Sequence, residues 1–355
     1  MRIAQVLPNL AIHDAIGNNV MLWRDCLTAL GHENTVIATS SDPDFSGFVL
    51  RRPELARWKP THIVYHFSTY DPLLDDIRIA GEAVRIMIYH NITPEEYFTG
   101  FSKIHADYST QARKQLRQLP GVFASAVADS EFNAQELREM GYARVPVLPL
   151  AVPVPMDVHD TKAVRGRWEA DGTLTILFVG RIAPNKRVND LLMAYHYLKA
   201  YVSRNCRLIL LGSWGNFEEY KKVLDAMVEE LQLSDVYFLG ETTDHVRDRW
   251  YALADVFVMP SEHEGFCVPI VEAWMADLPV IAARSSALPE TIGNAGVLYP
   301  VGRPAMLAEA IAAVWQEPGL AEVLVERGRL RSKEYQATRF LRRVSELLKG
   351  MSNDI

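Results

Sequence analysis

The feature that most constrains this 355-residue chain is an alternation of short apolar runs with amphipathic stretches. In the first part of the chain, the apolar runs predicted as buried strands lie at 2–8, 62–67, 85–91 and 121–130. These runs suit strands better than core helices because they are short, and the segments between them have helical spacing. Strands that alternate with helices are typical of parallel sheets, so we predict an α/β fold with a doubly wound sheet.

The alternation stops at a proline-rich segment and then starts again. Residues 146–158, PVLPLAVPVPMDV, hold four prolines in thirteen residues and predict a linker between domains. Apolar runs predicted as strands follow at 174–180, 207–213, 236–241, 255–261 and 279–285, and helices are predicted in the tail at 303–349. We therefore predict two Rossmann-like domains, 1–155 and 156–334, that face a central cleft.

Composition excludes several classes of protein. The net charge of −7 and the pI of about 5.8 give no global field that would attract nucleic acid. Cys26, Cys206 and Cys267 lack paired spacing, which argues against a disulfide framework and a zinc cluster and favours a reducing compartment. The chain also has neither a signal-peptide pattern nor a run of about 18 apolar residues, so we expect a cytoplasmic protein.

The loop RIAPNKR at 181–187 carries three cations ahead of a predicted helix. Ligands of doubly wound sheets bind at the carboxyl ends of strands, where this loop lies. A helix N-terminus favours anions, so local stability does not call for Arg181, Lys186 and Arg187 at this point. A polyanionic ligand would explain these cations, because Arg181 could bind it through two parallel hydrogen bonds and Lys186 through a flexible, charged ammonium group. A solvated surface loop is the alternative.

The stretch SEHEGFCVPIVEAW at 261–274 joins a predicted strand to a predicted helix. Residues 265–268 would offer backbone amides that a helix leaves unused at its start. Eight residues of helix rise by about 12 Å, so Glu264 and Glu272 are not expected to share a proton. They suit two distant hydroxyl groups of one long ligand, such as a sugar and a ribose. A capped, solvated helix is the alternative.

Three features of the first domain are weaker signals. Gly17 opens a helix after the first strand, where amides could meet a phosphate. Because G-x-G-x-x-G and the acidic residue of a nicotinamide site are missing, a dehydrogenase loses its main support. His90 ends a strand ahead of a turn at Pro94, and capping that strand is its alternative role. The string DPD at 42–44 suggests a metal ligand set but matches no cleft element, so we predict no metal site.

Two segments carry a resemblance to a known family. GRIAPNKR at 180–187, followed about eighty residues later by PSEHEGFCVPIVEA at 260–273, resembles the retaining glycosyltransferases of family 4, which have the GT-B fold. Glu264 and Glu272 match the E-x7-E motif of that family. ADSEFNAQEL at 128–137 and LPE at 288–290 are also similar to family segments, so the resemblance covers nearly the whole chain.

The resemblance implies a role for each candidate residue. Arg181 and Lys186 would bind the donor diphosphate, and Glu272 the ribose hydroxyls. Gly17 would approach the diphosphate from the first domain, although its loop is less glycine-rich than in many relatives, and His90 would lie near the sugar and the acceptor. The transferred sugar and the distal phosphate would be held by Glu264 and the amides of Gly265, Phe266, Cys267 and Val268. The last helix, 335–355, would cross back to the first domain.

We therefore predict a retaining hexosyltransferase that moves a sugar from a nucleotide sugar to a glycan, lipid-linked or small-molecule acceptor. Cations and amides can stabilise a leaving diphosphate without a metal, so we expect no cofactor. YHNITPEEYF at 89–98 is similar to bacterial surface-polysaccharide enzymes, which favours GDP-mannose over UDP-sugars. The alternatives are a sugar-nucleotide epimerase or phosphorylase on the same fold and a non-catalytic two-domain sugar-binding protein.

A basic stretch gives one further expectation about partners. Residues 109–119 carry Arg113, Lys114 and Arg117 and no acidic residue. This stretch could touch the anionic inner face of the cell membrane and a lipid-linked acceptor. A solvated basic face is the alternative.

Overall fold

The computed structural model describes residues 1–12, 14–78, 81–153 and 172–352. The chain forms two compact units. The first unit consists of Met1–Glu95, Ile104–Ala151 and Ala337–Ile355, and the second of Glu96–Lys103 and Val152–Gln336. The predicted domain boundary at 155/156 lies outside the described residues. The C-terminal segment and residues 96–103 thus each belong to a different unit from the residues that precede them.

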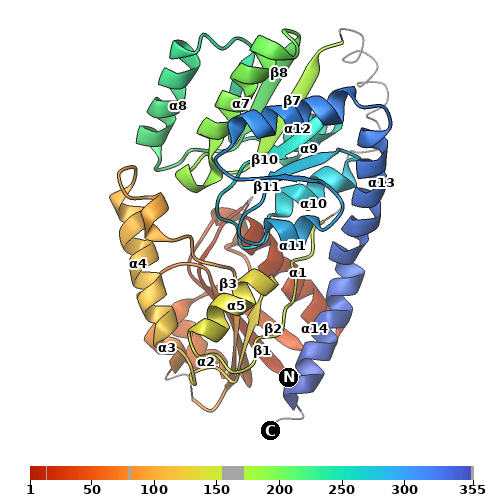
Figure 1. Ribbon diagram of the computed structural model, residues 1–355. Coiled ribbons are helices and arrows are strands. Elements are labelled where there is room, and N and C mark those ends of the chain that lie inside the picture. Colours follow the sequence, from red (N-terminus) through yellow and green to blue (C-terminus); the bar gives the residue numbers. More distant parts are fainter. Residues whose placement is uncertain (13, 79–80, 154–171, 353–355) are drawn as a thin grey trace. The chain divides into compact units, whose positions relative to one another are not determined.

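The first unit contains a six-stranded parallel sheet in the order β3-β2-β1-β4-β5-β6, of which Figure 1 labels β1, β2 and β3. Its strands are β1 Arg2–Leu10, β2 Glu33–Ser41, β3 Val49–Arg51, β4 His62–Phe67, β5 Val84–Tyr89 and β6 Ser125–Ala128. Its helices are α1 Ala15–Ala29, α2 Leu55–Trp58, α3 Leu74–Arg78, α4 Lys103–Arg117, α5 Glu131–Glu139 and α14 Ala337–Ser352. The sequence pattern missed β2 and β3, because β2 mixes polar with apolar residues and β3 is only three residues long.

The second unit repeats this architecture with the sheet order β12-β11-β10-β7-β8-β9. Its strands are β7 Leu174–Val179, β8 Cys206–Leu211, β9 Val236–Gly240, β10 Val256–Met259, β11 Val280–Ala283 and β12 Val297–Tyr299. Its helices are α7 Val188–Tyr201, α8 Glu218–Glu230, α9 Asp244–Leu253, α10 Val268–Met275, α11 Leu288–Ile292, α12 Pro304–Gln316 and α13 Leu320–Ser332. The short strand β12 was not predicted.

Counted within each unit, both sheets have the doubly wound order 3-2-1-4-5-6. This confirms the prediction of two Rossmann-like parallel sheets. In such a sheet the strand order reverses at one place, and ligands bind in the crevice outside the carboxyl ends of the strands there. That place lies between β1 and β4 in the first unit and between β7 and β10 in the second.

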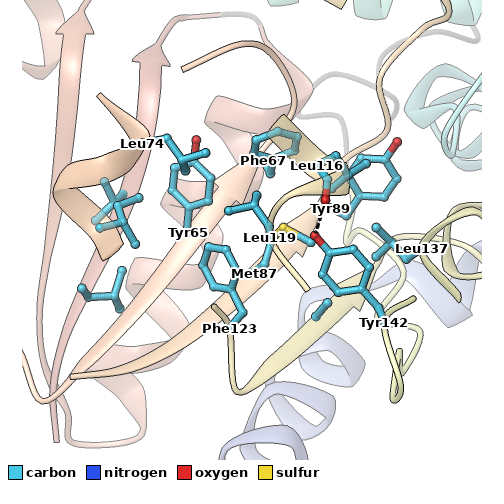
Figure 2. Packing of buried hydrophobic residues seen from close by; sticks show 14 of the residues in the cluster. Tyr65, Phe67, Leu74, Met87, Tyr89, Leu116, Leu119, Phe123, Leu137 and Tyr142 are labelled. Atoms are coloured by element: carbon cyan, nitrogen blue, oxygen red, sulfur yellow. Dashed lines mark hydrogen bonds between the residues drawn. The ribbon is translucent and has the colours of Figure 1, made fainter. Parts of the chain in front are cut away.

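The first sheet is covered by apolar side chains on both faces. On one face, Tyr65, Phe67, Met87 and Tyr89 pack with residues of α4 and α5, and Figure 2 shows the Tyr142 hydroxyl donating to the Leu116 carbonyl oxygen at 2.9 Å. On the other face, α1 and α14 pack against the strands. The apolar stripe of α14 comprises Phe340, Val344 and Leu348, spaced four residues apart. This stripe places α14 in the core of the first unit.

In the second unit, α10 packs closely against α13. The Trp274 side chain of α10 is 1% exposed, and its indole N–H donates to the Ala295 carbonyl oxygen at 2.9 Å. A Cβ atom built on Gly328 of α13 would lie 2.4 Å from Trp274 Cδ1, closer than a real Cβ atom can approach. A glycine at 328 therefore lets α13 approach the indole of α10.

This contact generates a stability prediction. Gly328→Ala should lower the free energy of unfolding by about 1–3 kcal/mol, because the added methyl group overpacks the indole. Gly350→Ala is the matched control, since Gly350 is also helical but has no atom within 4 Å of an added Cβ. There alanine should be neutral or stabilise by about 0.5–1 kcal/mol. Urea titrations of both variants test this, and a Gly328→Ala variant as stable as the wild type would contradict the packing argument.

Candidate active site

The loops after β7 and β10 are joined by an ion pair. Lys186 ends the short η6 helix, Pro184–Lys186, which follows β7, and Glu264 lies in the loop between β10 and α10. The Lys186 Nζ atom lies 2.6 Å from Glu264 Oε1, and the two side chains are 17% and 10% exposed. A lysine ammonium has three N–H donors, so its bond to Glu264 leaves two for a ligand. The structure thus brings together two residues predicted separately from the sequence.

Short polar side chains fix the backbone on both sides of this pair. The backbone carbonyl oxygen of the buried Asn185 accepts from the Glu262 amide at 2.9 Å. The side-chain amide of Asn185 donates to the His263 carbonyl oxygen at 3.1 Å. The Ser286 hydroxyl accepts from the Glu264 amide at 2.8 Å. The protein itself therefore holds both loops in place, as a preorganised binding site requires.

Residues 265–268 lead into α10, which begins at Val268. Cys267 precedes it with φ of +84°, a conformation rare in residues other than glycine and found often at functional sites. The Phe266 and Cys267 side chains are buried, and the Phe266 carbonyl oxygen accepts from the Thr291 hydroxyl at 2.8 Å. Burial raises the pKa of the Cys267 thiol well above its usual range, and nearby Glu264 adds to this, so the thiol is not a candidate nucleophile. At Phe266 and Cys267, the backbone groups and not the side chains are therefore the candidates for contact with a ligand.

Glu272 lies within α10 and has partners of its own. Its Oε2 accepts from the Tyr251 hydroxyl at 2.8 Å, and its Oε1 lies 3.8 Å from Arg247 Nη1. Burial raises the pKa of Glu272, and Arg247 and the Tyr251 hydrogen bond oppose this in part. Because α10 begins only after Glu264, the helical rise of about 12 Å does not describe the separation of the two glutamates, which corrects that step of the prediction. Glu264 and Glu272 occupy separate environments.

The three cations of the loop at 181–187 differ in their surroundings. Arg187 makes two hydrogen bonds to Asp190, at 2.9 and 3.1 Å, and lies 3.3 Å from Glu262, so these carboxylates neutralise its charge. Arg181 is exposed, and its guanidinium carbon lies 5.4 Å from the centre of the Phe217 ring. Arg187 therefore fixes the start of α7, and Arg181 and Lys186 are better placed to serve a ligand.

In the first unit, packing explains the glycine at position 17. A Cβ atom there would lie 2.4 Å from the Ala11 carbonyl oxygen, so another residue would push the loop after β1 away from α1. The Gly17 amide lies 3.3 Å from the Asp14 carboxylate, which caps the helix. The close approach of this loop to α1 accounts for the glycine.

His90 is part of a buried chain of polar groups. Its ring is 1% exposed, with Nδ1 2.8 Å from Asp129 Oδ2 and Nε2 2.9 Å from His66 Nδ1. The two imidazole rings stack at 5.2 Å, and His66 Nε2 lies 3.1 Å from Gln5 Oε1. Both ring nitrogens of His90 already have partners. His90 would therefore have to release one of them to exchange a proton with a substrate.

Sequence reasoning missed Gln5, His66 and Asp129. Burial lowers the pKa of His66 well below its usual range, with a smaller contribution from His90, and burial raises the pKa of Asp129 against the opposing effect of His90. Each missed residue is a polar group within or directly after a buried strand: β1, β4 and β6. That placement is the signal that could have revealed them.

Neither a metal-binding group nor a membrane-spanning helix occurs in the described ranges. There, no group of three or more His, Cys, Asp or Glu residues is arranged to hold a metal ion. Across the same ranges, every helix is too short or too polar to span a bilayer. In α4, Arg113 is paired with Glu136 at 2.5 Å, so Lys114 and Arg117 are the exposed cations of the predicted basic stretch.

Solved structures with the same architecture define the class of fold. The structure aligns with Anabaena HepE in complex with UDP and glucose at a TM-score of 0.78 and 17% identity, over 98% of this chain and 99% of that chain. It aligns with a glycosyltransferase of Rickettsia africae at a TM-score of 0.77 and 16% identity, over 100% and 99% of the two chains. The protein therefore has the GT-B fold.

Sequence comparison shows which proteins the chain resembles. Residues 160–331, just under half of the chain, match the model of the family described as "Glycosyl transferases group 1". The "O-antigen chain mannosyltransferase B" of Escherichia coli is 31% identical over 160 residues, which are 45% of this chain and 41% of the relative. A "D-inositol 3-phosphate glycosyltransferase" of Streptomyces bingchenggensis is 31% identical over 263 residues, 69% of this chain and 57% of the relative. The chain spans about half the length of the curated relatives it matches.

The buried chain that ends at Asp129 generates a stability prediction. Asp129→Asn should lower the free energy of unfolding by about 1–3 kcal/mol, because the amide loses the charge-assisted partner of His90 in a buried position. Asp75→Asn is the control, since the Asp75 side chain is 84% exposed and should change stability by less than about 0.5 kcal/mol. Equal urea midpoints for Asp129→Asn and the wild type would show that the hydrogen bond between His90 and Asp129 contributes nothing to the free energy of unfolding.

Proposed function

We propose that this protein is a glycosyltransferase that transfers a hexose from a nucleotide sugar to a hydroxyl acceptor with retention of anomeric configuration. The observation that carries this proposal is the Lys186–Glu264 ion pair, which joins the loops after β7 and β10 within the segment that matches the model of group 1 glycosyl transferases. A cation and a carboxylate side by side suit a sugar diphosphate, which presents anionic phosphates next to neutral hydroxyl groups.

The leaving group explains the cations of the site. When the bond between the sugar and the diphosphate breaks, negative charge grows on the phosphate oxygens. Interactions that strengthen with this charge lower the barrier. Lys186 has two N–H donors left beside Glu264, and Arg181 supplies a second cation from the same loop. The amides of residues 265–268 would add neutral donors at the start of α10. We expect these groups to act without a metal ion.

The two glutamates would serve different hydroxyl groups of the donor. Glu264, oriented by Lys186 and by the bond from its amide to Ser286, would accept from hydroxyls of the transferred sugar. Glu272, oriented by Tyr251 and Arg247, would accept from the ribose hydroxyls. Separate partners keep the two carboxylates independent, so each can be tested alone.

The names of relatives support a mannose donor and a glycan or small-molecule acceptor. Besides the Escherichia coli mannosyltransferase, a "GDP-mannose-dependent alpha-mannosyltransferase" of Mycolicibacterium smegmatis is 33% identical over 131 residues. The Anabaena structure with UDP and glucose keeps UDP-sugars as the alternative. On the acceptor side, we propose that His90, with its ring fixed by Asp129 and His66, lies near the transferred sugar and the acceptor. We also propose that Lys114 and Arg117 of α4 contact anionic lipid.

Steady-state kinetics with a panel of GDP- and UDP-sugars test the proposed reaction. We expect turnover of one donor, GDP-mannose first, with retention of configuration in the product. Lys186→Ala should lose about 10²–10³-fold in kcat, with a smaller rise in donor KM, because the lost donor acts on charge that develops during the reaction. Arg181→Ala should behave likewise, and the double variant should be less impaired than the product of the two effects.

Lys222→Ala is the matched control, because Lys222 lies in the same unit but is 69% exposed and pairs with the exposed Glu219. It should keep wild-type kinetics. Epimerised or phosphorolysed donors would favour the enzymes of the same fold that remain as alternatives. Binding of a sugar nucleotide without any turnover would favour the non-catalytic sugar-binding protein.

Glu272 generates a prediction of pH dependence. Burial raises the folded-state pKa of Glu272, and ribose hydroxyls need the ionised carboxylate as acceptor. Affinity for the nucleoside diphosphate should thus be full above this pKa and fall as the pH drops through it, by up to about 1.5–3 kcal/mol. Glu272→Gln should bind weakly at pH 7 and lack this component, which calorimetry between pH 5 and 7.5 can measure. Because the phosphates titrate equally in both proteins, identical pH profiles would exclude the ribose role.

A further inference from the structure

Residues 96–103, EYFTGFSK, follow β5 in the sequence but belong to the second unit. We call this segment the aromatic strap. It contacts second-unit rings through three side chains. The ring pairs and their centroid distances are Tyr97 with His263 at 5.8 Å, Phe98 with Phe217 at 5.3 Å, and Phe101 with Tyr220 at 5.3 Å. These contacts attach a segment from the first half of the chain to the unit that carries the donor site.

Each ring partner of the strap is close to the candidate donor site. His263 precedes Glu264 in the chain, and its carbonyl oxygen accepts from Asn185. The Tyr220 hydroxyl donates to the Asn189 side chain at 2.8 Å, in the first turn of α7. Phe217 makes the most direct connection, because its ring lies against the Arg181 guanidinium. The strap therefore touches the supports of the site rather than an unrelated surface.

Phe98, Phe217 and Arg181 form a column. Phe98 is 3% exposed and Phe217 is fully buried, with their ring planes inclined by 30°. Arg181 is exposed and has a long, flexible side chain. An aromatic face attracts a guanidinium through its quadrupole and so favours the rotamers that keep the cation above the ring. Because both rings are buried, packing restricts their movement, and the Phe217 ring can limit the positions of the Arg181 guanidinium.

We propose that Phe217, supported by Phe98 of the aromatic strap, is a positioning residue that holds the Arg181 guanidinium where the donor diphosphate binds. This inference rests on the proposed function and assigns to residues 96–103 a role in the donor site. It requires that loss of the Phe217 ring weaken binding of the diphosphate only while Arg181 is present. It also requires that binding of the nucleoside without phosphates be unaffected.

A double-mutant cycle measured by calorimetry tests the column. The proteins are wild type, Arg181→Ala, Phe217→Leu and the double variant, and the probes are GDP and UDP, each paired with its nucleoside. Leucine keeps an apolar side chain at 217 but removes the ring. We expect Phe217→Leu to weaken binding of the nucleoside diphosphate about 2- to 5-fold, the range of an exposed cation–π contact, and to have no effect in the Arg181→Ala background.

Two strap variants complete the test. Phe98→Leu should weaken diphosphate binding in the same direction, and it carries the test if Phe217→Leu does not fold. Phe101→Leu is the matched control, because its partner is Tyr220 and not the column, and its effect should be the same with and without Arg181. Equal losses for diphosphate and nucleoside, or additive effects of Arg181→Ala and Phe217→Leu, would overturn the positioning role. A wild-type protein that binds neither GDP nor UDP would instead overturn the proposed function, and this inference with it.

Discussion

The ion pair between Lys186 and Glu264 is the interaction on which the candidate site depends. It joins two loops that lie far apart in the sequence and next to each other at the carboxyl edge of the second sheet. A pair at 10–17% exposure gains from attraction but loses hydration, and removal of one partner leaves the other charge uncompensated. Such a pair is weak evidence for stability. The pair lies at the edge where ligands of doubly wound sheets bind, on a backbone held by Asn185 and Ser286. This position favours a role in binding an anion over a role in stabilising the fold.

The two carboxylates near α10 illustrate how environment separates similar groups. Glu264 is paired with Lys186 in the loop before α10. Glu272 lies in α10 against Tyr251 and Arg247, and Arg247 also pairs with Asp248. Burial raises the pKa of Glu272, so this side chain is sensitive to mild acid. One motif can thus provide two hydroxyl acceptors in different surroundings. That difference follows from packing and not from the residue type.

Much of the fold could be predicted from the sequence because buried strands are short apolar runs with helical segments between them. The strands β2, β3 and β12 were missed for physical reasons: β2 carries many polar residues, and β3 and β12 are three residues long at sheet edges. The sheet order itself does not appear in a local pattern. It arises from long-range pairing, such as that of β10 with β7, which α7, β8, α8, β9 and α9 separate in the sequence.

The candidate site was predictable residue by residue, but its connections were not. The resemblance to family 4 singled out Lys186 and Glu264, and no spacing rule could reveal that the two side chains meet. Arg187 was grouped with them as a cation, and only the fold places Asp190 and Glu262 against it. His66 and Asp129 were missed because their link to His90 depends on β4, β5 and β6 lying side by side.

We propose above all that the edge between β7 and β10 binds a nucleoside diphosphate through Lys186. A crystal structure of the full chain with the nucleoside diphosphate of its donor tests this most directly. We expect a phosphate oxygen about 2.7–3.0 Å from Lys186 Nζ, a second phosphate facing the amides of residues 265–268, and a ribose hydroxyl donating to Glu272. A diphosphate bound elsewhere, with the Lys186–Glu264 pair closed and without contact to the ligand, would contradict it.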